Sequence, residues 1–432
     1  MMLNRSITKW DLVLLVINSI IGAGIFGLPS KIFGLSGVYS LLAFAVCAIV
    51  VLIFILCFAE VSSRFDETGG PYLYALKGLG KFPAFMTGWL LLLSRIFNYA
   101  TLINLLVIYL SFFNPLFNDK IPRALCILFL TSIIAYINHI GVKNSTRVNN
   151  ILTIAKLLPL SAFIIIGLFN LQPELLISTG LPSFSSFSTS VLLLVFAFGG
   201  FESVLINSGE IREPRKNLPF ALITAAIIVT IFYCLIQLVS IGTLPSLASS
   251  EKPLAEAATG FMGNTGGIII AIGALVSISG TLNAIVLGGS RLPFALSREK
   301  QFPKLFSYVN PVHLTPTWSL LLFIGVTTIV SLVWSFFAAL TIGSIIRVLV
   351  YLMVCLSMIR LRLRDNGSEN YFRLRFGYWF AGIGIALAIW LLSALKLSEA
   401  WDVLLCMLIG VGIYLLQKFF AFNKTSSPPI KA

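Results

Sequence analysis

The sequence predicts an all-α integral membrane protein with twelve transmembrane helices. Of its 432 residues, 58% are hydrophobic and only 11% are charged, whereas about a quarter of the residues in soluble domains are charged. Apolar runs of about 20 residues, the length that a helix needs to cross a bilayer, recur along nearly the whole chain. Lys and Arg residues also gather in the segments on one side of these runs.

The apolar runs follow one another with short polar connections, so we expect a single polytopic domain over residues 1–432. The first run begins near Leu12, lacks an A-x-A-type cleavage site and is too long for the h-region of a signal peptide, so it is expected to remain as a span. The outer connections 171–187 and 244–264 are rich in Ser, Pro and Gly, and the polar tail 423–432 is expected to be disordered. The predicted spans are 11–35, 37–61, 84–113, 121–140, 150–170, 188–208, 218–243, 265–288, 317–336, 338–360, 375–395 and 399–420.

The basic residues predict the orientation of the chain. If the N-terminus is cytoplasmic, the inner segments hold 22 of the 30 Lys and Arg residues, the outer segments hold five, and three lie within spans. Because cytoplasmic loops carry the excess of Lys and Arg, and the number of spans is even, both termini are expected in the cytoplasm, with the chain in the inner (cytoplasmic) membrane. The net charge of +14 is then a topology signal first and an attraction to anionic membrane lipid second, and no nucleic-acid partner is expected.

Several kinds of chemistry are not expected from this sequence. The six cysteines all lie within apolar runs and none forms a C-x-x-C pair, so we interpret them as small apolar residues rather than as disulfides or a metal site. The sequence contains no nucleotide-binding loop, metal-ligand cluster or Ser/His/Asp set. An enzyme is therefore not predicted, and no cofactor or metal is expected.

The first apolar run contains helix-breaking residues at its centre, in the stretch NSIIGAGIFGLP. Gly and Pro are poor helix formers, and unwound backbone survives at membrane depth only where it is buried in protein or lines a cavity. The residues Gly22, Gly24, Gly27 and Pro29 predict local unwinding around 22–26. Gly22 lies ten residues after Leu12, or about 15 Å along a helix, which places the unwinding near the membrane midplane.

The sixth run, VFAFGGFES, has a second interruption at Gly199 and Gly200. Two interrupted helices at corresponding places of two halves point to a transporter binding site, which favours two five-helix repeats (about 11–170 and 188–360) and two extra helices (about 375–420). The N-termini of the half-helices can bind a carboxylate and the freed carbonyls an ammonium, so an α-amino acid fits. Alternatively, the glycines only allow close helix packing.

Several stretches together resemble the amino acid–polyamine–organocation (APC) superfamily of transporters. They are IGAGIFGLP (21–29), ETGGPYLYALKGLGKFPAFMTGW (67–89), FAFGGFESVLINSGEIREPRKNLP (196–219) and SRLPFALSREKQFP (290–303). The resemblance implies the LeuT-type fold, a 5+5 inverted repeat with spans 1 and 6 broken, alternating access, and an amino acid or related amine as substrate. The candidate substrate-binding residues at the two breaks are Ile21, Gly22, Ala23, Gly24, Ile25, Phe198, Gly199, Gly200, Phe201 and Glu202.

Span five, NNILTIAKLLPL, carries Lys156 inside an apolar run. Burial makes the charged form of a lysine costly, so the side chain can load and release a proton. In the proton-coupled bacterial transporters that this chain resembles, a lysine here takes the place of a sodium ion between spans one and eight. The resemblance therefore implies a proton-coupling role for Lys156. The alternative is that the side chain snorkels to the inner interface.

Three further charged residues lie at membrane depth: Arg95 in span three, Arg347 in span ten, and Glu202 beside the span-six break. Arg95 shares a helix face with Tyr99, and the matching region of span three contributes to the substrate site in arginine/agmatine-type exchangers of the superfamily that this chain resembles. Charged residues at this depth usually have partners. Either Glu202 pairs with an arginine and fixes helix packing, or Arg95 or Arg347 recognises an acidic side chain or second carboxylate.

Small polar residues of span eight are also candidates for the site. The residues that span eight offers to line the site are Ser277, Ser279, Thr281 and Asn283. Of these, Ser279 and Asn283 are predicted to bind substrate, although such residues also serve as contacts between helices. The rings that flank the span-six break, among them Phe198 and Phe201, either close over the substrate or pack in the core.

These observations predict a secondary active transporter that moves amino acids by alternating access, coupled to protons by symport. An exchanger of one amino acid for another or for an amine is the alternative. A channel or non-transporting receptor is less consistent with two broken helices around a central site. The sequence leaves open which amino acid is carried and whether the protein is a monomer or a homodimer.

Overall fold

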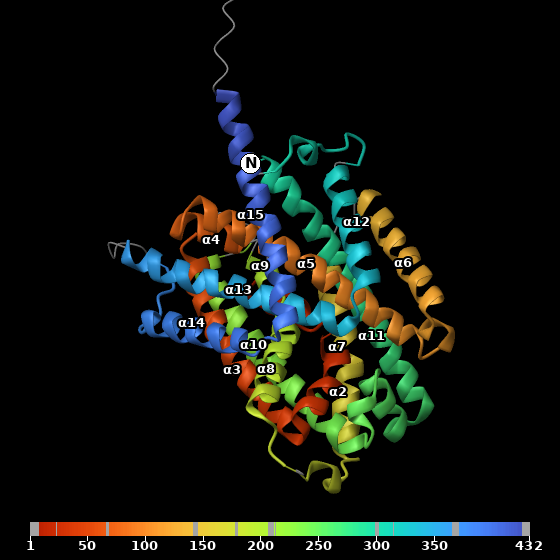
Figure 1. The fold of residues 1–432 in the computed structure, drawn as a ribbon. Coiled ribbons are helices and arrows are strands. Elements are labelled where there is room, and N and C mark those ends of the chain that lie inside the picture. Colours follow the sequence, from red (N-terminus) through yellow and green to blue (C-terminus); the bar gives the residue numbers. More distant parts are fainter. Residues whose placement is uncertain are drawn as a thin grey trace, which may run out of the picture.

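The structure is a computed structural model that describes residues 8–22, 24–65, 69–140, 146–177, 180–205, 211, 213–298, 302–313, 315–364 and 371–425. Within these residues the backbone forms fifteen α-helices joined by turns and short 3₁₀ helices (Figure 1). The α-helices of the N-terminal half are α1 (Lys9–Ile20), α2 (Gly24–Ser36), α3 (Ser40–Ser63), α4 (Gly70–Gly78), α5 (Lys81–Leu110), α6 (Lys120–Ile140), α7 (Thr146–Leu168), α8 (Phe184–Phe198) and α9 (Glu202–Leu205). Those that follow are α10 (Pro214–Thr243), α11 (Pro253–Arg298), α12 (Thr317–Val333), α13 (Phe336–Leu363), α14 (Gly377–Ser393) and α15 (Leu397–Thr425). The 3₁₀ helices are Gly37–Tyr39, Pro115–Asn118, Pro173–Leu176, Leu247–Ser249 and Lys304–Ser307.

Seven helical segments of the described chain are long and apolar enough to cross a membrane, and four further apolar helices are shorter. Most of α5 is buried, whereas large apolar side chains on α6 and α15 are exposed, as expected of faces that meet lipid. The chain is therefore a multi-pass membrane protein. Each of the twelve predicted spans overlaps one of the observed helices or a consecutive pair.

Polar caps explain where several of these helices begin. Thr8 precedes α1 and accepts a hydrogen bond from the backbone N–H of Asp11 at 3.3 Å, in a capping box. Ser183 caps α8 and Ser335 caps α13 in the same way, through their side-chain oxygens. A cap of this kind satisfies one of the N–H groups that a helix start leaves without a partner.

Two boundaries differ from the sequence predictions. The predicted outer loop 244–264 is wrong in its second half, because α11 already begins at Pro253 and bends at Gly263, where φ is 69° and ψ is −175°. Proline at a first helical position and glycine at a positive φ both favour this geometry. The predicted disordered tail also starts too early, since α15 continues to Thr425, and residues 426–432 lie outside the described part.

The interior is built around α5, which packs against α13 and α11, while α3 packs against α10 and α8. In Figure 1, α5 runs through the middle of the molecule, and α6 and α12 lie side by side at one edge. α1 contacts α9, and α2 contacts α8. The two pairs of half-helices predicted from the sequence therefore lie against each other.

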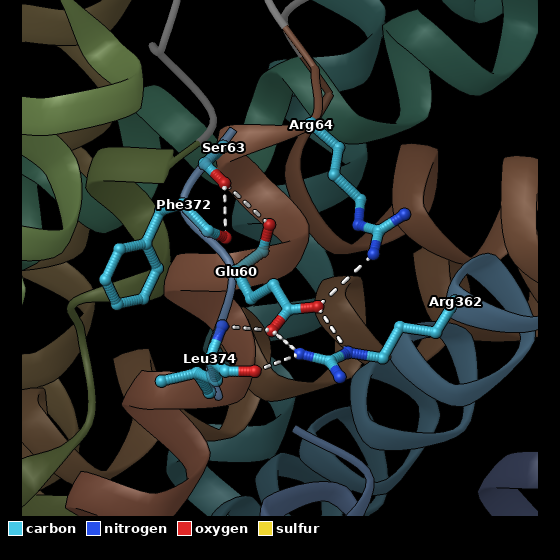
Figure 2. A network of polar contacts seen from close by, with 6 residues as sticks. All are labelled: Glu60, Ser63, Arg64, Arg362, Phe372 and Leu374. Atoms are coloured by element: carbon cyan, nitrogen blue, oxygen red, sulfur yellow. Dashed lines mark hydrogen bonds and ion pairs between the residues drawn. The ribbon is translucent and has the colours of Figure 1, made fainter. Parts of the chain in front are cut away.

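A buried ion-pair network connects α3 to α13 and to the segment that leads into α14 (Figure 2). The Glu60 side chain is fully buried and accepts hydrogen bonds from Arg362 Nε at 2.7 Å and Arg362 Nη2 at 2.6 Å. Arg64 Nη2 donates to the same carboxylate at 3.3 Å, and the backbone N–H of Leu374 donates at 2.9 Å. Both carboxylate oxygens are thus satisfied by donors from three separate segments.

Candidate functional site

The first helical break separates α1 from α2. Helix α1 ends at Ile20, the backbone of Ile21 and Gly22 is not helical, and α2 begins at Gly24. Ala23 lies outside the described residues. The break is where the sequence predicts it, but the predicted unwound stretch ends too late because α2 resumes at Gly24.

Gly24 is required by a close approach of two helices rather than by the unwinding. A Cβ atom at this position would lie 2.8 Å from Cα and 2.9 Å from Cβ of Ala197 on α8. Such distances are too short for any side chain. Gly24 therefore lets α2 lie directly against α8, while its neighbour Ile25 is fully buried in the core.

Lys156 reaches the first break from α7. Its side chain is only 6% exposed, and Nζ donates to the carbonyl of Asn18 at 2.9 Å and to that of Ile21 at 2.7 Å. The amine therefore turns inward to the carbonyl end of α1 rather than to the membrane surface. A cation at this end of a helix is favoured by the helix dipole.

The second break separates α8 from α9. Helix α8 ends at Phe198 and α9 begins at Glu202, so that the residues from Gly199 to Phe201 interrupt the helix as the sequence predicts. Helix α8 has 15 residues, or about 22 Å, which is short of the roughly 30 Å of a bilayer core.

The two glycines of this break are needed for different contacts. A Cβ atom on Gly199 would overlap the guanidinium of Arg347. Gly200 has a φ of 112°, and a Cβ there would overlap the carbonyl oxygen of Ser19 in α1. A residue other than glycine is strained at such a φ. The second break therefore packs directly on the end of α1.

Tyr233 on α10 joins the two breaks. Its hydroxyl lies 3.2 Å from the carbonyl oxygen of Ile20 and 3.1 Å from that of Ala197, so one hydroxyl proton is shared between the ends of α1 and α8. Its ring packs edge-to-face on Phe198, with 5.1 Å between the ring centroids. Sequence reasoning missed this residue. The signal was a tyrosine within an apolar span, whose buried hydroxyl needs a partner.

Arg347 and Glu202 form a buried ion pair beside the second break, with 3.2 Å between Arg347 Nε and Glu202 Oε1. Arg347 Nη1 also donates to the carbonyl of Phe196 at 3.0 Å. The other Glu202 oxygen, Oε2, accepts from the backbone N–H of Gly200 at 2.9 Å and lies 3.4 Å from the hydroxyl of Tyr351. Of the two arginines that the sequence offered as partners for Glu202, the structure pairs it with Arg347.

Arg95 lies nearby but has different neighbours. Its Nη2 donates to the hydroxyl of Ser203 on α9 at 3.1 Å, and its guanidinium packs over Gly288 on α11, where a Cβ would lie 3.3 Å from Nη1. Arg95 therefore stands where α5, α9 and α11 meet, immediately beyond the second break.

Three predicted site residues are not brought to the breaks. The hydroxyl of Tyr99 bonds Thr131 on α6 at 3.0 Å. Asn283 accepts from Nδ2 of Asn138, also on α6, at 2.8 Å. Ser279 is exposed. The face of α11 nearer the first break instead carries Thr281.

The remaining contacts around the breaks are of two kinds. Thr281 Oγ1 would lie 3.6 Å from a Cβ on Gly22, so α11 lines the first break at this residue. The ring of Phe201 is fully buried and packs against Phe58 and Tyr351, with centroids 5.2 and 5.5 Å apart. Core packing therefore accounts for Phe201.

Taken together, the two breaks put the N-terminus of α2 and the carbonyl end of α8 side by side in the interior. A lysine amine lies on the end of α1, and a charged cluster lies beside α9. Helix ends of opposite polarity in a low-dielectric interior suit a small zwitterion.

Comparison with known proteins finds matches along almost the whole chain. A family model described as amino acid permease matches residues 7–414. The methylthioribose transporter of Bacillus subtilis (strain 168) is 27% identical over 98% of this chain and 95% of its own length. The serine/threonine exchanger SteT of the same organism is 28% identical, with 92% of each chain covered. The branched-chain amino acid permease BcaP, also of Bacillus subtilis (strain 168), is 27% identical over 96% of this chain and 93% of its own length.

Proposed function

Because this chain belongs to the amino acid permease family, whose members are transporters and not enzymes, we propose that it is a secondary active transporter that moves an amino acid across the cytoplasmic membrane by alternating access. Twelve membrane crossings in the LeuT-type 5+5 arrangement, with both termini in the cytoplasm, belong to this proposal. The overlap of the twelve predicted spans with the observed helices supports the crossings. The excess of Lys and Arg in the inner segments supports the orientation.

The contact between the two breaks is the observation that carries the proposal. Gly24 lies against Ala197, and the Tyr233 hydroxyl bonds the carbonyls of both Ile20 and Ala197. The two interruptions therefore lie next to each other in the protein interior. The first N–H groups of α2 have no partner within their own helix and can bind the substrate carboxylate. The carbonyl end of α8 is suited to the substrate ammonium.

Lys156 supports coupling to protons. Its two carbonyl partners, on Asn18 and Ile21, flank the last turn of α1 and the start of the break. A protonated amine holds these carbonyls with charge-assisted hydrogen bonds, and a neutral amine holds them less firmly. Loading a proton on Lys156 is thereby linked to the shape of the first break, as symport requires.

Exchange of one amino acid for another is the second candidate. The observation that favours it is the relative SteT, which is described as a serine/threonine exchanger and covers 92% of this chain. Lys156 favours symport. The two modes differ in whether a second amino acid is needed on the far side of the membrane: exchange needs one, and symport does not.

Uptake into sealed vesicles tests the proposal. The purified chain is reconstituted in vesicles of phosphatidylethanolamine and phosphatidylglycerol, and uptake of each labelled amino acid is measured with and without an inward proton gradient. Accumulation in empty vesicles that depends on the gradient supports symport, whereas uptake only into preloaded vesicles supports exchange. If no amino acid enters under either condition, the proposal is wrong.

Gly24→Leu is expected to abolish substrate binding while the protein still reaches the membrane. The new side chain would meet the backbone of Ala197 and push α2 away from α8, which separates the two breaks. The matched control is Gly34→Leu in the same helix, where a Cβ would come no closer than 3.8 Å to its nearest neighbour. Thermal stabilisation by substrate measures binding. Equal stabilisation of both variants would contradict a substrate site at the first break.

A further inference from the structure

A surplus positive charge lies beside the second break, on Arg95. Its guanidinium donates to a neutral hydroxyl, that of Ser203, at 3.1 Å. Among the residues that the structure describes, no carboxylate oxygen lies within 4.0 Å of this guanidinium. Charged side chains at membrane depth are costly and are usually paired. Arg95 is thus a cation at membrane depth without an anionic partner among the described side chains.

The carboxylate of Glu202, beside the second break, is already occupied. Glu202 forms the ion pair with Arg347 at 3.2 Å and accepts the N–H of Gly200 at 2.9 Å. The charge of Arg347 is therefore balanced by Glu202, and its Nη1 donates a hydrogen bond to the carbonyl of Phe196. Among the described residues beside this break, two arginines face one glutamate, and the contacts leave the additional positive charge on Arg95.

We propose that the substrate supplies the missing anion: it is an amino acid with an acidic side chain, whose second carboxylate binds Arg95. The inference rests on the proposed function, because it places the substrate α-carboxylate and ammonium at the two breaks. Arginine and a carboxylate match as a planar, bidentate pair, which is stronger than a neutral hydrogen bond.

The position of Arg95 suits this role. Its partner Ser203 lies in α9, three residues after Gly200 of the second break, so Arg95 reaches the helix that begins directly after this break. Gly288 places no side chain of its own against the guanidinium, where a Cβ would lie 3.3 Å from Nη1. The Ser203 hydroxyl holds Nη2 in place, so that Ser203 is a positioning residue and Arg95 the residue that touches substrate.

The charge surplus predicts selectivity between acids and their amides. Glutamate and glutamine have nearly the same shape, but only glutamate pairs Arg95. A site whose buried polar group is left unpaired by the wrong ligand rejects that ligand strongly. We expect glutamate or aspartate to bind at least about tenfold more tightly than glutamine or asparagine, equivalent to about 1.4 kcal/mol or more.

The test compares the four ligands on the wild-type protein and on three variants, by thermal stabilisation in detergent and by competition for uptake in vesicles. Arg95→Gln is expected to remove the preference for acid over amide, and Arg95→Lys to keep part of it. The matched control is Arg123→Gln, which removes a partly buried arginine that bonds Asn104 at the far end of α5, and it should keep the preference.

The outcomes separate this inference from the proposed function. If neutral amino acids are taken up and acids are not, or if Arg95→Gln leaves the acid-to-amide ratio unchanged, the inference is wrong and the transport function stands. If no amino acid binds or enters the wild-type protein, both are wrong. Should Arg95→Gln fail to fold, the wild-type ratio and Arg95→Lys still decide, because an acid-to-amide ratio near one overturns the inference.

Discussion

Lys156→Ala is expected to abolish the dependence of uptake on the proton gradient, so that accumulation with the gradient falls to the level measured without it. The alanine removes the amine that bonds the carbonyls of Asn18 and Ile21. No other described lysine lies on the first break. Without a group that gains and loses a proton there, substrate movement no longer carries a proton. Uptake in vesicles over a series of external pH values measures the effect.

Two further variants make the result specific. Lys156→Arg keeps a positive charge but cannot release a proton, so it should also abolish the pH dependence. Lys252→Ala removes a lysine whose amine bonds the Ser111 hydroxyl at 3.2 Å and not a residue of either break, and it should leave the pH dependence intact. Gradient-driven uptake by Lys156→Ala would show that the coupling group lies elsewhere.

The two breaks could be predicted from sequence because the residues that make them are unusual in an apolar span. Gly199 and Gly200 lie in the second break, and Gly24 lies at the edge of the first. The reason for Gly24 was not predictable, since it depends on Ala197, which is 173 positions away and contacts it only after the chain has folded. Local propensity therefore located the interruptions but not what they touch.

The partners of the polar side chains could not be predicted for the same reason. The sequence offered Arg95 and Arg347 equally to Glu202, and only the packing of α13 against α8 selects Arg347. Tyr99 shares a helix face with Arg95, yet the face is broad enough for Tyr99 to meet α6 while Arg95 meets α9. A helical spacing restricts the direction of a side chain to a sector of the helix surface, but it does not determine which residue of a neighbouring helix the side chain contacts.

Glu60→Gln is expected to cause the largest loss of stability of any single polar substitution proposed for this chain, about 3–5 kcal/mol, measured as a fall in the melting temperature in detergent. The carboxylate is fully buried and binds Arg362 through two hydrogen bonds of 2.7 and 2.6 Å. An amide of the same shape turns its NH₂ group toward donors and leaves the guanidinium unpaired. The loss should be unrelated to substrate, because this network lies away from the breaks.

Two comparisons separate the unpaired charge from the loss of contacts. Glu213→Gln breaks an ion pair with Lys216 whose side chains are 65% and 84% exposed, and it should change stability by no more than about 1 kcal/mol. In the interior, Glu60→Leu combined with Arg362→Met should destabilise the protein less than Glu60→Leu alone, because the double change leaves no guanidinium facing an apolar side chain. If the double variant is instead the less stable one, Arg362 contributes through its own hydrogen bond to the Leu374 carbonyl, at 2.6 Å, and not only through its pairing with Glu60. The stabilising contact would then be the one between α13 and the segment that leads into α14.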